Sequence, residues 1–316
     1  MVVYKFLSSH NLIVELNTFI HEAAEAIADL CIQAGKNVLE IYNSPFSYSQ
    51  KEDKSPITEA DKISHSVICR GLSNITQSYL GYSLPILSEE GSSIPFKERS
   101  SWDFYWLIDP LDGTKEFIKK NGEFTINIAL IKKNTPFAGF IYAPVLDELF
   151  YGIPDLGAFK ISGCLNKSPL SLKNHAIPIS PPHKEESSSA TIRIISSKSH
   201  LNDATRDFID GLKNCFTFVD IISAGSSLKF CRVAEGKADI YPRLGPTMEW
   251  DTAAGHCICT IAGCRVVDLL TGEEPVYNKK DLHNGEFAVC SVSKPGVLAL
   301  TPGRTEADTP CPPAGA

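Results

Sequence analysis

The sequence lacks an excess of basic residues, because 30 Lys and Arg stand against 37 Asp and Glu and the formal net charge is −7. Proteins that bind nucleic-acid polymers usually carry a basic surface, so this balance argues against such a polymer as the main partner. It leaves room for a small anionic substrate, since a few local cations or metal ions can outweigh the net charge.

The sequence also lacks any uninterrupted run of about 18 apolar residues that could span a membrane. Its first residues show no basic region followed by an apolar stretch and a small-residue cleavage site. We therefore expect a cytoplasmic protein without a transmembrane segment. Loose attachment to the inner face of a membrane stays open, although no basic amphipathic patch demands it. The choice between a monomer and a homodimer stays open too.

The ten cysteines lack the spacing of paired zinc knuckles. Their densest group is Cys257, Cys259 and Cys264, in an apolar stretch that reads as a helix running into a strand. A metal cluster is the alternative, but this setting favours reduced thiols packed in the core.

Helix-like and strand-like segments alternate along the 316 residues. Apolar residues recur with helical spacing over 15–42 and again after Asp61. Further helices are predicted near 203–213, near 226–235 and from Asp251 onward, and short apolar runs predict strands at 85–88, 104–109, 124–131, 136–143, 148–153, 191–196, 217–222 and 238–241. This intermingling indicates layers of mixed α/β structure.

One internal segment, 174–190, contains three prolines and a serine run and reads as a linker. We expect an N-terminal α+β half over 1–180 and a C-terminal α/β half over 185–298. The Pro-, Gly- and Ala-rich residues 301–316 are predicted to be a disordered tail.

The most informative segment is WLIDPLDGTKEFI, residues 106–118. An apolar strand leads to Asp109, Pro110 predicts a turn, and Asp112 follows before Gly113 and Thr114 open a helix. Two carboxylates this close repel each other unless cations bridge them, and Mg²⁺ prefers such oxygen ligands. The backbone N–H groups of Gly113 and Thr114 would face an anion at the start of that helix. The alternative is an Asp-rich turn with a helix cap.

Three further acidic residues strengthen the metal interpretation. Glu89 follows a predicted strand, Asp251 stands at a predicted helix start before small residues, and Asp61 follows Thr58. Taken singly, these residues also fit a solvated acidic turn or an ordinary helix cap. Taken together, they supply the oxygen ligands of a phosphate site with two or three metal ions.

These motifs, SPITEAD (55–61), SEE (88–90), DPLDGT (109–114) and WDTAAG (250–255), resemble the inositol monophosphatase superfamily of Mg²⁺-dependent, lithium-sensitive phosphatases. The resemblance runs from about residue 20 to residue 292, and over 225–256 it is strongest to the CysQ-type 3′(2′),5′-bisphosphate nucleotidases. It implies a mixed α/β (α+β) fold, a layered αβαβα sandwich, with the site between its two halves.

Carried over residue by residue, the resemblance implies that Glu89, Asp109 and the Leu111 carbonyl hold one metal ion. Asp109, Asp112 and Asp251 would hold a second ion, and Asp61 would help with a third. Glu89 and Thr114 match the pair that orients and deprotonates the attacking water. The implied cofactor is Mg²⁺, although Mn²⁺ shares its oxygen ligands.

The resemblance also implies which side chains select the substrate. Arg243 stands where simple inositol monophosphatases carry an acidic residue, and its guanidinium can bind a second phosphate. Lys229 and Ser226 match residues that touch the phosphate that is not hydrolysed, and His200 matches a loop that meets the nucleoside. The remaining residues expected to bind the substrate are Glu89, Leu111, Asp112, Gly113, Thr114 and Asp251.

Each of the three basic residues has an ordinary structural alternative. Lys229 could be solvated on an amphipathic helix, and His200 could be a surface loop residue. Arg243 could pair with Glu249 or Asp239.

The expected function is hydrolysis of adenosine 3′,5′-bisphosphate to AMP and phosphate, with 3′-phosphoadenylyl sulfate as a second substrate. The expected partner is therefore a small nucleotide bisphosphate. One alternative is a phosphatase acting on inositol 1-phosphate or a sugar bisphosphate. The other is a non-catalytic regulator that binds metal and phosphate.

Overall fold

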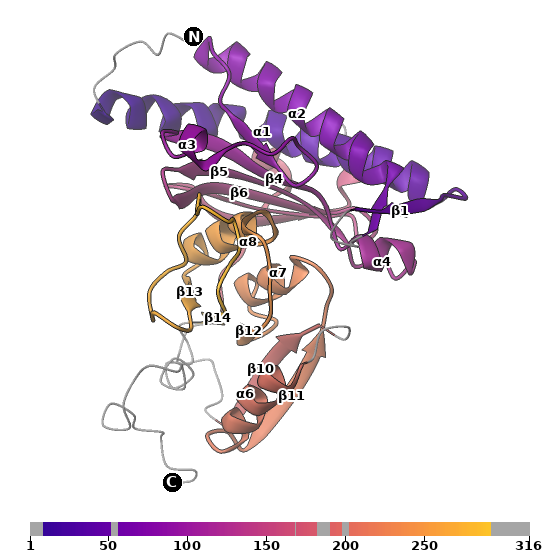
Figure 1. Ribbon diagram of the computed structural model, residues 1–316, viewed down its shortest axis with the longest axis vertical. Coiled ribbons are helices and arrows are strands. Elements are labelled where there is room, and N and C mark those ends of the chain that lie inside the picture. The colour runs from indigo at the N-terminus through magenta and orange to yellow at the C-terminus, as the bar shows by residue number, and fades with distance from the viewer. Residues whose placement is uncertain (1–8, 52–55, 168, 182–189, 198–201, 292–316) are drawn as a thin grey trace.

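The computed structural model describes residues 9–51, 56–167, 169–181, 190–197 and 202–291. They form five layers, in the order helix, sheet, helix, sheet, helix (Figure 1). The prediction of a mixed α/β fold in a layered sandwich is confirmed.

The first layer consists of α1 (Ser9–Tyr42) and α2 (Glu59–Leu80). The apolar stripe of α1 is buried against the first sheet, as its spacing predicted. The short antiparallel pair β1 (Tyr48–Gln50) and β2 (Pro56–Thr58) leads into α2. The α2 helix begins at Glu59 because Thr58 and Asp61 form a capping box across its first turn.

The second layer is a seven-stranded sheet in the order β3-β4-β5-β6-β7-β8-β9. Its strands are β3 (Ile86–Ser88), β4 (Phe104–Asp112), β5 (Thr125–Lys132), β6 (Thr135–Ala143), β7 (Glu148–Ile153), β8 (Gly157–Ser162) and β9 (Ile177–Pro178). Strands β3 and β4 are parallel, and the other neighbours are antiparallel. The central strands are continuous apolar runs because helices cover both faces: Trp106 faces α1 and α2, whereas Leu107 faces α7 and α8.

The middle layer consists of α7 (Leu228–Ala234) and α8 (Glu249–Ile261). The small residues of WDTAAG let α8 pack closely, as expected. A Cβ on Gly255 would lie 2.4 Å from Cγ of Phe230 in α7. A Cβ on Gly139 of β6 would lie 2.5 Å from the Ala254 carbonyl oxygen. The helix begins two residues before the predicted start at Asp251, so this boundary prediction is corrected.

The fourth layer is a five-stranded sheet in the order β11-β10-β12-β14-β13. Its strands are β10 (Thr191–Ser196), β11 (Phe218–Ser223), β12 (Ile240–Arg243), β13 (Cys264–Asp268) and β14 (Phe287–Ser291). The helix α6 (Asp203–Lys213) forms the fifth layer, and its Ile209 and Leu212 pack on Ile194 and Ile240. Short helical segments α3 (Phe96–Arg99), α4 (Thr114–Ile118), η1 (Cys164–Asn166) and α5 (Leu172–His175) connect the strands.

Part of the predicted linker is regular structure. The α5 helix extends to His175, and Ile177 and Pro178 pair with β8 at the edge of the first sheet. The linker prediction is therefore wrong for residues 174–178, whereas 182–189 and the predicted tail 301–316 lie outside the described residues.

Seven of the nine described cysteines are buried, including Cys257, Cys259 and Cys264, which fits the core-packing interpretation. Across the described ranges, the structure contains no helix with the length and hydropathy needed to cross a membrane.

Candidate functional site

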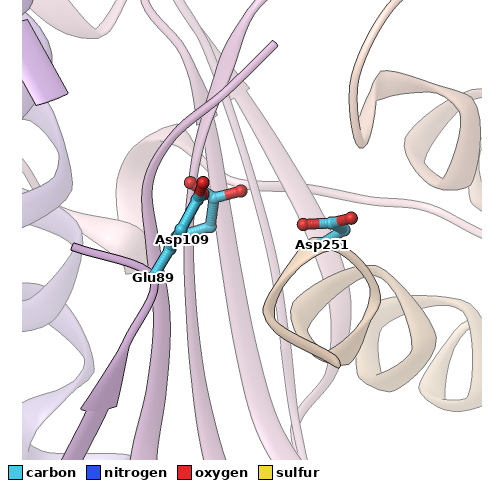
Figure 2. Close-up of side chains that lie close together, drawn as sticks. All are labelled: Glu89, Asp109 and Asp251. Atoms are coloured by element: carbon cyan, nitrogen blue, oxygen red, sulfur yellow. The ribbon is translucent and has the colours of Figure 1, made fainter. Parts of the chain in front are cut away.

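Three carboxylates from three separate segments meet between the first sheet and α8. Glu89 follows β3, Asp109 belongs to β4 and Asp251 lies in the first turn of α8. One ligand oxygen from each lies within 4.8 Å of the others. Figure 2 shows Glu89 and Asp109 side by side, with Asp251 facing them across a short gap. The parallel pairing of Ser88 with Ile108 brings Glu89 beside Asp109, so the sheet itself builds this half of the site.

Burial and mutual repulsion both disfavour the ionised form of the carboxylates in this cluster. Burial raises the pKa of Asp109 well above its ordinary value, and the nearby charges of Glu89 and Asp112 raise it further. Burial, followed by the charge of Asp112, also raises the pKa of Asp251. Within the described ranges neither Asp109 nor Asp251 has an ion-pair partner. Bound cations would offset this repulsion and hold the carboxylates ionised.

The strand that carries Asp109 does not turn at Pro110, which corrects the sequence prediction. Strand β4 continues to Asp112, with an irregular register between Asp109 and Asp112. Asp109 pairs with Asn127 and Asp112 with Thr125, so β4 has one residue more than its partner. A bulge tolerates Pro110, which has no N–H to donate. Both carboxylates thereby line one cavity of 270 Å³, the carboxylate cavity.

Asp112 is held by two hydroxyls from the segment before α7. Its Oδ2 accepts hydrogen bonds from Ser226 at 2.6 Å and Ser227 at 2.8 Å. Ser227 also lies 2.9 Å from the Asp251 carbonyl oxygen and receives a hydrogen bond from Asn127. Sequence reasoning missed the roles of Ser227 and Asn127. The paired serines of GSSLK, residues 225–229, were a signal for Ser227.

Asp61 contacts Thr114, which stands at the start of α4. Thr114 Oγ1 donates to Asp61 Oδ1 at 3.1 Å, while Asp61 Oδ2 accepts from the Thr58 backbone N–H at 2.7 Å and from its hydroxyl at 2.6 Å. Thr114 Oγ1 also lies 3.4 Å from the Leu111 carbonyl oxygen. Gly113 adopts a left-handed conformation, with φ of 91°, which a glycine accommodates without strain. Asp61 is buried, which raises its pKa, and it lies behind Thr114 instead of lining the carboxylate cavity.

Lys51 is a cation at the site that sequence reasoning did not identify. Its Nζ lies 2.8 Å from Glu89 Oε1 and 2.5 Å from Glu90 Oε1. The sequence around Lys51 resembles that of any lysine in a polar turn. Its contacts with Glu89 and Glu90 depend on the tertiary position of the β1–β2 pair, which the sequence pattern does not show.

For two of the basic residues predicted to select the substrate, Lys229 and Arg243, the structure contradicts the ordinary structural alternative. Lys229 is 5% exposed, and its Nζ donates to the Ser226 carbonyl at 2.7 Å, so it is not solvated. Burial lowers the pKa of Lys229 to about 8. Arg243 does not pair with Asp239 or Glu249, because Arg193 holds Asp239 and Lys279 holds Glu249, each at 2.8 Å.

Arg243 and Lys229 both line the carboxylate cavity. Arg243 donates to the Pro246 carbonyl at 2.8 Å, and its buried Nε has no hydrogen-bond partner within the part of the chain that the structure describes. Ser226 uses its hydroxyl on Asp112, as above. His200 lies outside the described residues.

Comparisons with known proteins identify the family of the chain. The family model "Inositol monophosphatase family" matches residues 20–302. A 3′(2′),5′-bisphosphate nucleotidase CysQ from Salmonella typhimurium is 40% identical over 246 residues, which is 77% of this chain and 89% of that protein. CysQ from Buchnera aphidicola is 39% identical over 79% of this chain and 86% of its own length.

Solved structures give the same relationship. The crystal structure of CysQ from Bacteroides thetaiotaomicron superposes with a TM-score of 0.73 at 41% identity, covering 85% of this chain and 97% of that one. An IMPase/NADP phosphatase solved with Mg²⁺ and phosphate shares the fold, with a TM-score of 0.67 at 17% identity over 90% of this chain and 97% of that chain. The matched motifs, the five-layered fold and these relatives lead to one conclusion: the chain belongs to the inositol monophosphatase family.

Proposed function

We propose that this protein is a Mg²⁺-dependent 3′(2′),5′-bisphosphate nucleotidase that hydrolyses adenosine 3′,5′-bisphosphate to AMP and phosphate. The observation that carries the proposal is the convergence of Glu89, Asp109 and Asp251 beside two buried or half-buried cations, Lys229 and Arg243. Bisphosphate nucleotidases that are about 40% identical to it over 77% to 85% of the chain support the same substrate class.

The donor set fits a hard divalent cation. All three converging ligands are carboxylates, and the described residues bring neither a His nor a Cys ligand into this group. Oxygen-only sites suit Mg²⁺, and a relative in the same fold was solved with Mg²⁺ and phosphate. Glu89, Asp109 and the Leu111 carbonyl oxygen would hold one ion, and Asp109, Asp112 and Asp251 would hold a second. Asp61, which the family resemblance links to a third ion, instead accepts hydrogen bonds from Thr58 and Thr114.

Mg²⁺, when bound, supplies the Lewis-acid charge that activates water and stabilises the transferring phosphoryl group. Thr114 and Glu89, which both line the carboxylate cavity, orient the attacking water. The Thr114 hydroxyl already donates to Asp61, so a proton taken up at Thr114 Oγ1 passes to Asp61 Oδ1, 3.1 Å away. Lys229 and Arg243 bind the phosphate that stays on the nucleotide.

The test is phosphate release with Mg²⁺ from adenosine 3′,5′-bisphosphate and inositol 1-phosphate, measured side by side with and without millimolar lithium. A strong, lithium-sensitive preference for the nucleotide is expected. Preference for inositol 1-phosphate would refute the roles of Lys229 and Arg243 while retaining the metal site. Measurable Mg²⁺ binding with no turnover of either substrate would instead indicate a non-catalytic regulator.

A further inference from the structure

Two cavities meet at the candidate site. The carboxylate cavity adjoins a second cavity of 740 Å³, which is lined by the segment from Tyr241 to Met248 together with Trp250 and His283. We call this second space the adjoining cavity. The residues that line both cavities include two cations, Lys115 and Arg243. Lys115 belongs to the first half of the chain and Arg243 to the second, so these cations reach the boundary from different elements, α4 and β12.

Lys115 differs from the other two cations in how its charge is used. Lys229 directs its ammonium at the Ser226 carbonyl, and Arg243 uses one nitrogen on the Pro246 carbonyl. Lys115 is exposed, and its ammonium has no hydrogen bond or ion pair within the described residues. The neighbouring residues Glu116 and Phe117 are buried, which fixes the short helix that carries Lys115. Lys115 therefore projects from a fixed backbone with all its donors available.

The charge of the carboxylate cavity explains why such a cation is needed. Its lining holds five carboxylates, those of Glu89, Asp109, Asp112, Glu116 and Asp251. Metal ions can offset this charge where the hydrolysed phosphate lies. A second phosphate several bonds away meets the same negative wall and requires cations of its own at the boundary between the cavities.

We propose that Lys115 is a further substrate-binding residue, which contacts the phosphate that stays on the nucleotide and acts together with Arg243. This assignment rests on the proposed bisphosphate substrate. It makes Lys115 a specificity residue: it contributes to binding of a bisphosphate and nothing to binding of a substrate that has only the hydrolysed phosphate.

The experiment compares Lys115→Gln with Lys119→Gln. Lys119 is a matched control, because it is exposed, lies four residues later at the end of the same helix, and lines neither cavity. Steady-state kinetics are measured with adenosine 3′,5′-bisphosphate and with adenosine 3′-monophosphate, and binding of AMP is measured by titration calorimetry. Melting temperatures of both variants show whether the fold is kept.

We expect Lys115→Gln to raise KM for the bisphosphate about tenfold, as the loss of one charge-assisted contact predicts, with kcat nearly unchanged. AMP should bind correspondingly more weakly, the monophosphate KM should not change, and Lys115→Arg should restore much of the affinity. Equal bisphosphate KM values in the Lys115→Gln and Lys119→Gln variants would overturn the proposal.

The failure of the proposed function gives a different result. It would appear as the absence of bisphosphate turnover by the unmodified protein. The role of Lys115 would then still be decided by calorimetry with adenosine 3′,5′-bisphosphate itself, where equal affinity of the two variants contradicts it.

Discussion

The two walls of the site are built in opposite ways. The wall from the first sheet presents Glu89, Asp109 and Asp112, whose negative charges are held close together by strand pairing and a bulge. The wall from the second half presents Lys229 and Arg243, whose charges are partly satisfied by main-chain carbonyls. The first wall therefore needs added cations, whereas the second keeps a donor for a ligand, because the buried Arg243 Nε has no hydrogen-bond partner among the described residues.

This difference suggests a division of labour. We infer that the carboxylate wall, joined by Asp251, does the chemistry once cations bind, and that the cationic wall recognises what the substrate carries besides the reacting phosphate. Substitutions on the first wall should lower kcat for every substrate. Substitutions on the second should change the choice between substrates.

The largest effect is expected from Asp109→Asn. Asp109 lies between Glu89 and Asp251, so its loss should lower kcat by orders of magnitude for nucleotide and inositol substrates alike. Without metal the same change should raise the melting temperature, because it removes a buried carboxylate whose repulsion destabilises the fold. Kinetics with Mg²⁺ and melting curves with a chelator measure the two effects. Near-normal turnover would end the assignment of Asp109 as a bridging ligand.

Thr114→Ala should lower kcat about 10²- to 10³-fold, because it removes the hydroxyl that donates to Asp61 and that we propose orients the attacking water. The KM for both substrate classes should change little, since the hydroxyl acts on the water. Thr135→Ala, at an exposed threonine at the start of β6, serves as the control. A change in KM with kcat unchanged would move Thr114 from the chemical step to substrate binding.

The strand ends and their carboxylates could be predicted from sequence because short-range patterns encode them. Apolar runs end at Ser88 and Asp109, and the capping pattern around Thr58 marks the first turn of α2. The family resemblance then ordered these residues into one site, and the structure brings Glu89, Asp109 and Asp251 together as that order implied.

What could not be predicted depends on contacts between distant segments. The continuation of β4 through Pro110 depends on pairing with β5, so a local proline rule gave a turn instead of a bulge. The burial of Lys229 and the contact of Lys51 with Glu89 arise from tertiary packing, which the spacing of residues along the sequence does not reveal. Likewise, the partners that keep Asp239 and Glu249 away from Arg243 lie at least 30 residues from them in sequence.

Arg243→Glu tests the second wall. The change replaces a cation that lines both cavities with an anion, so KM for adenosine 3′,5′-bisphosphate should rise by about 10- to 100-fold. Turnover of a substrate with one phosphate should change much less. Arg265→Glu, at an exposed position of β13, controls for the change in net charge. An unchanged preference for bisphosphate over monophosphate would contradict the division of labour.

The smallest effect is expected from pH, acting through Lys229. Burial lowers its pKa to about 8, so the side chain is charged below this pH and loses its proton as the pH rises through it. The KM for the bisphosphate should therefore increase several-fold above about pH 8, while KM for a monophosphate follows only the groups shared by both substrates. In Lys229→Met this difference between the two pH profiles should disappear. If it persists, another group on the cationic wall titrates, and Lys229 serves the packing against Tyr241 instead, where its ammonium lies 5.3 Å from the ring centroid.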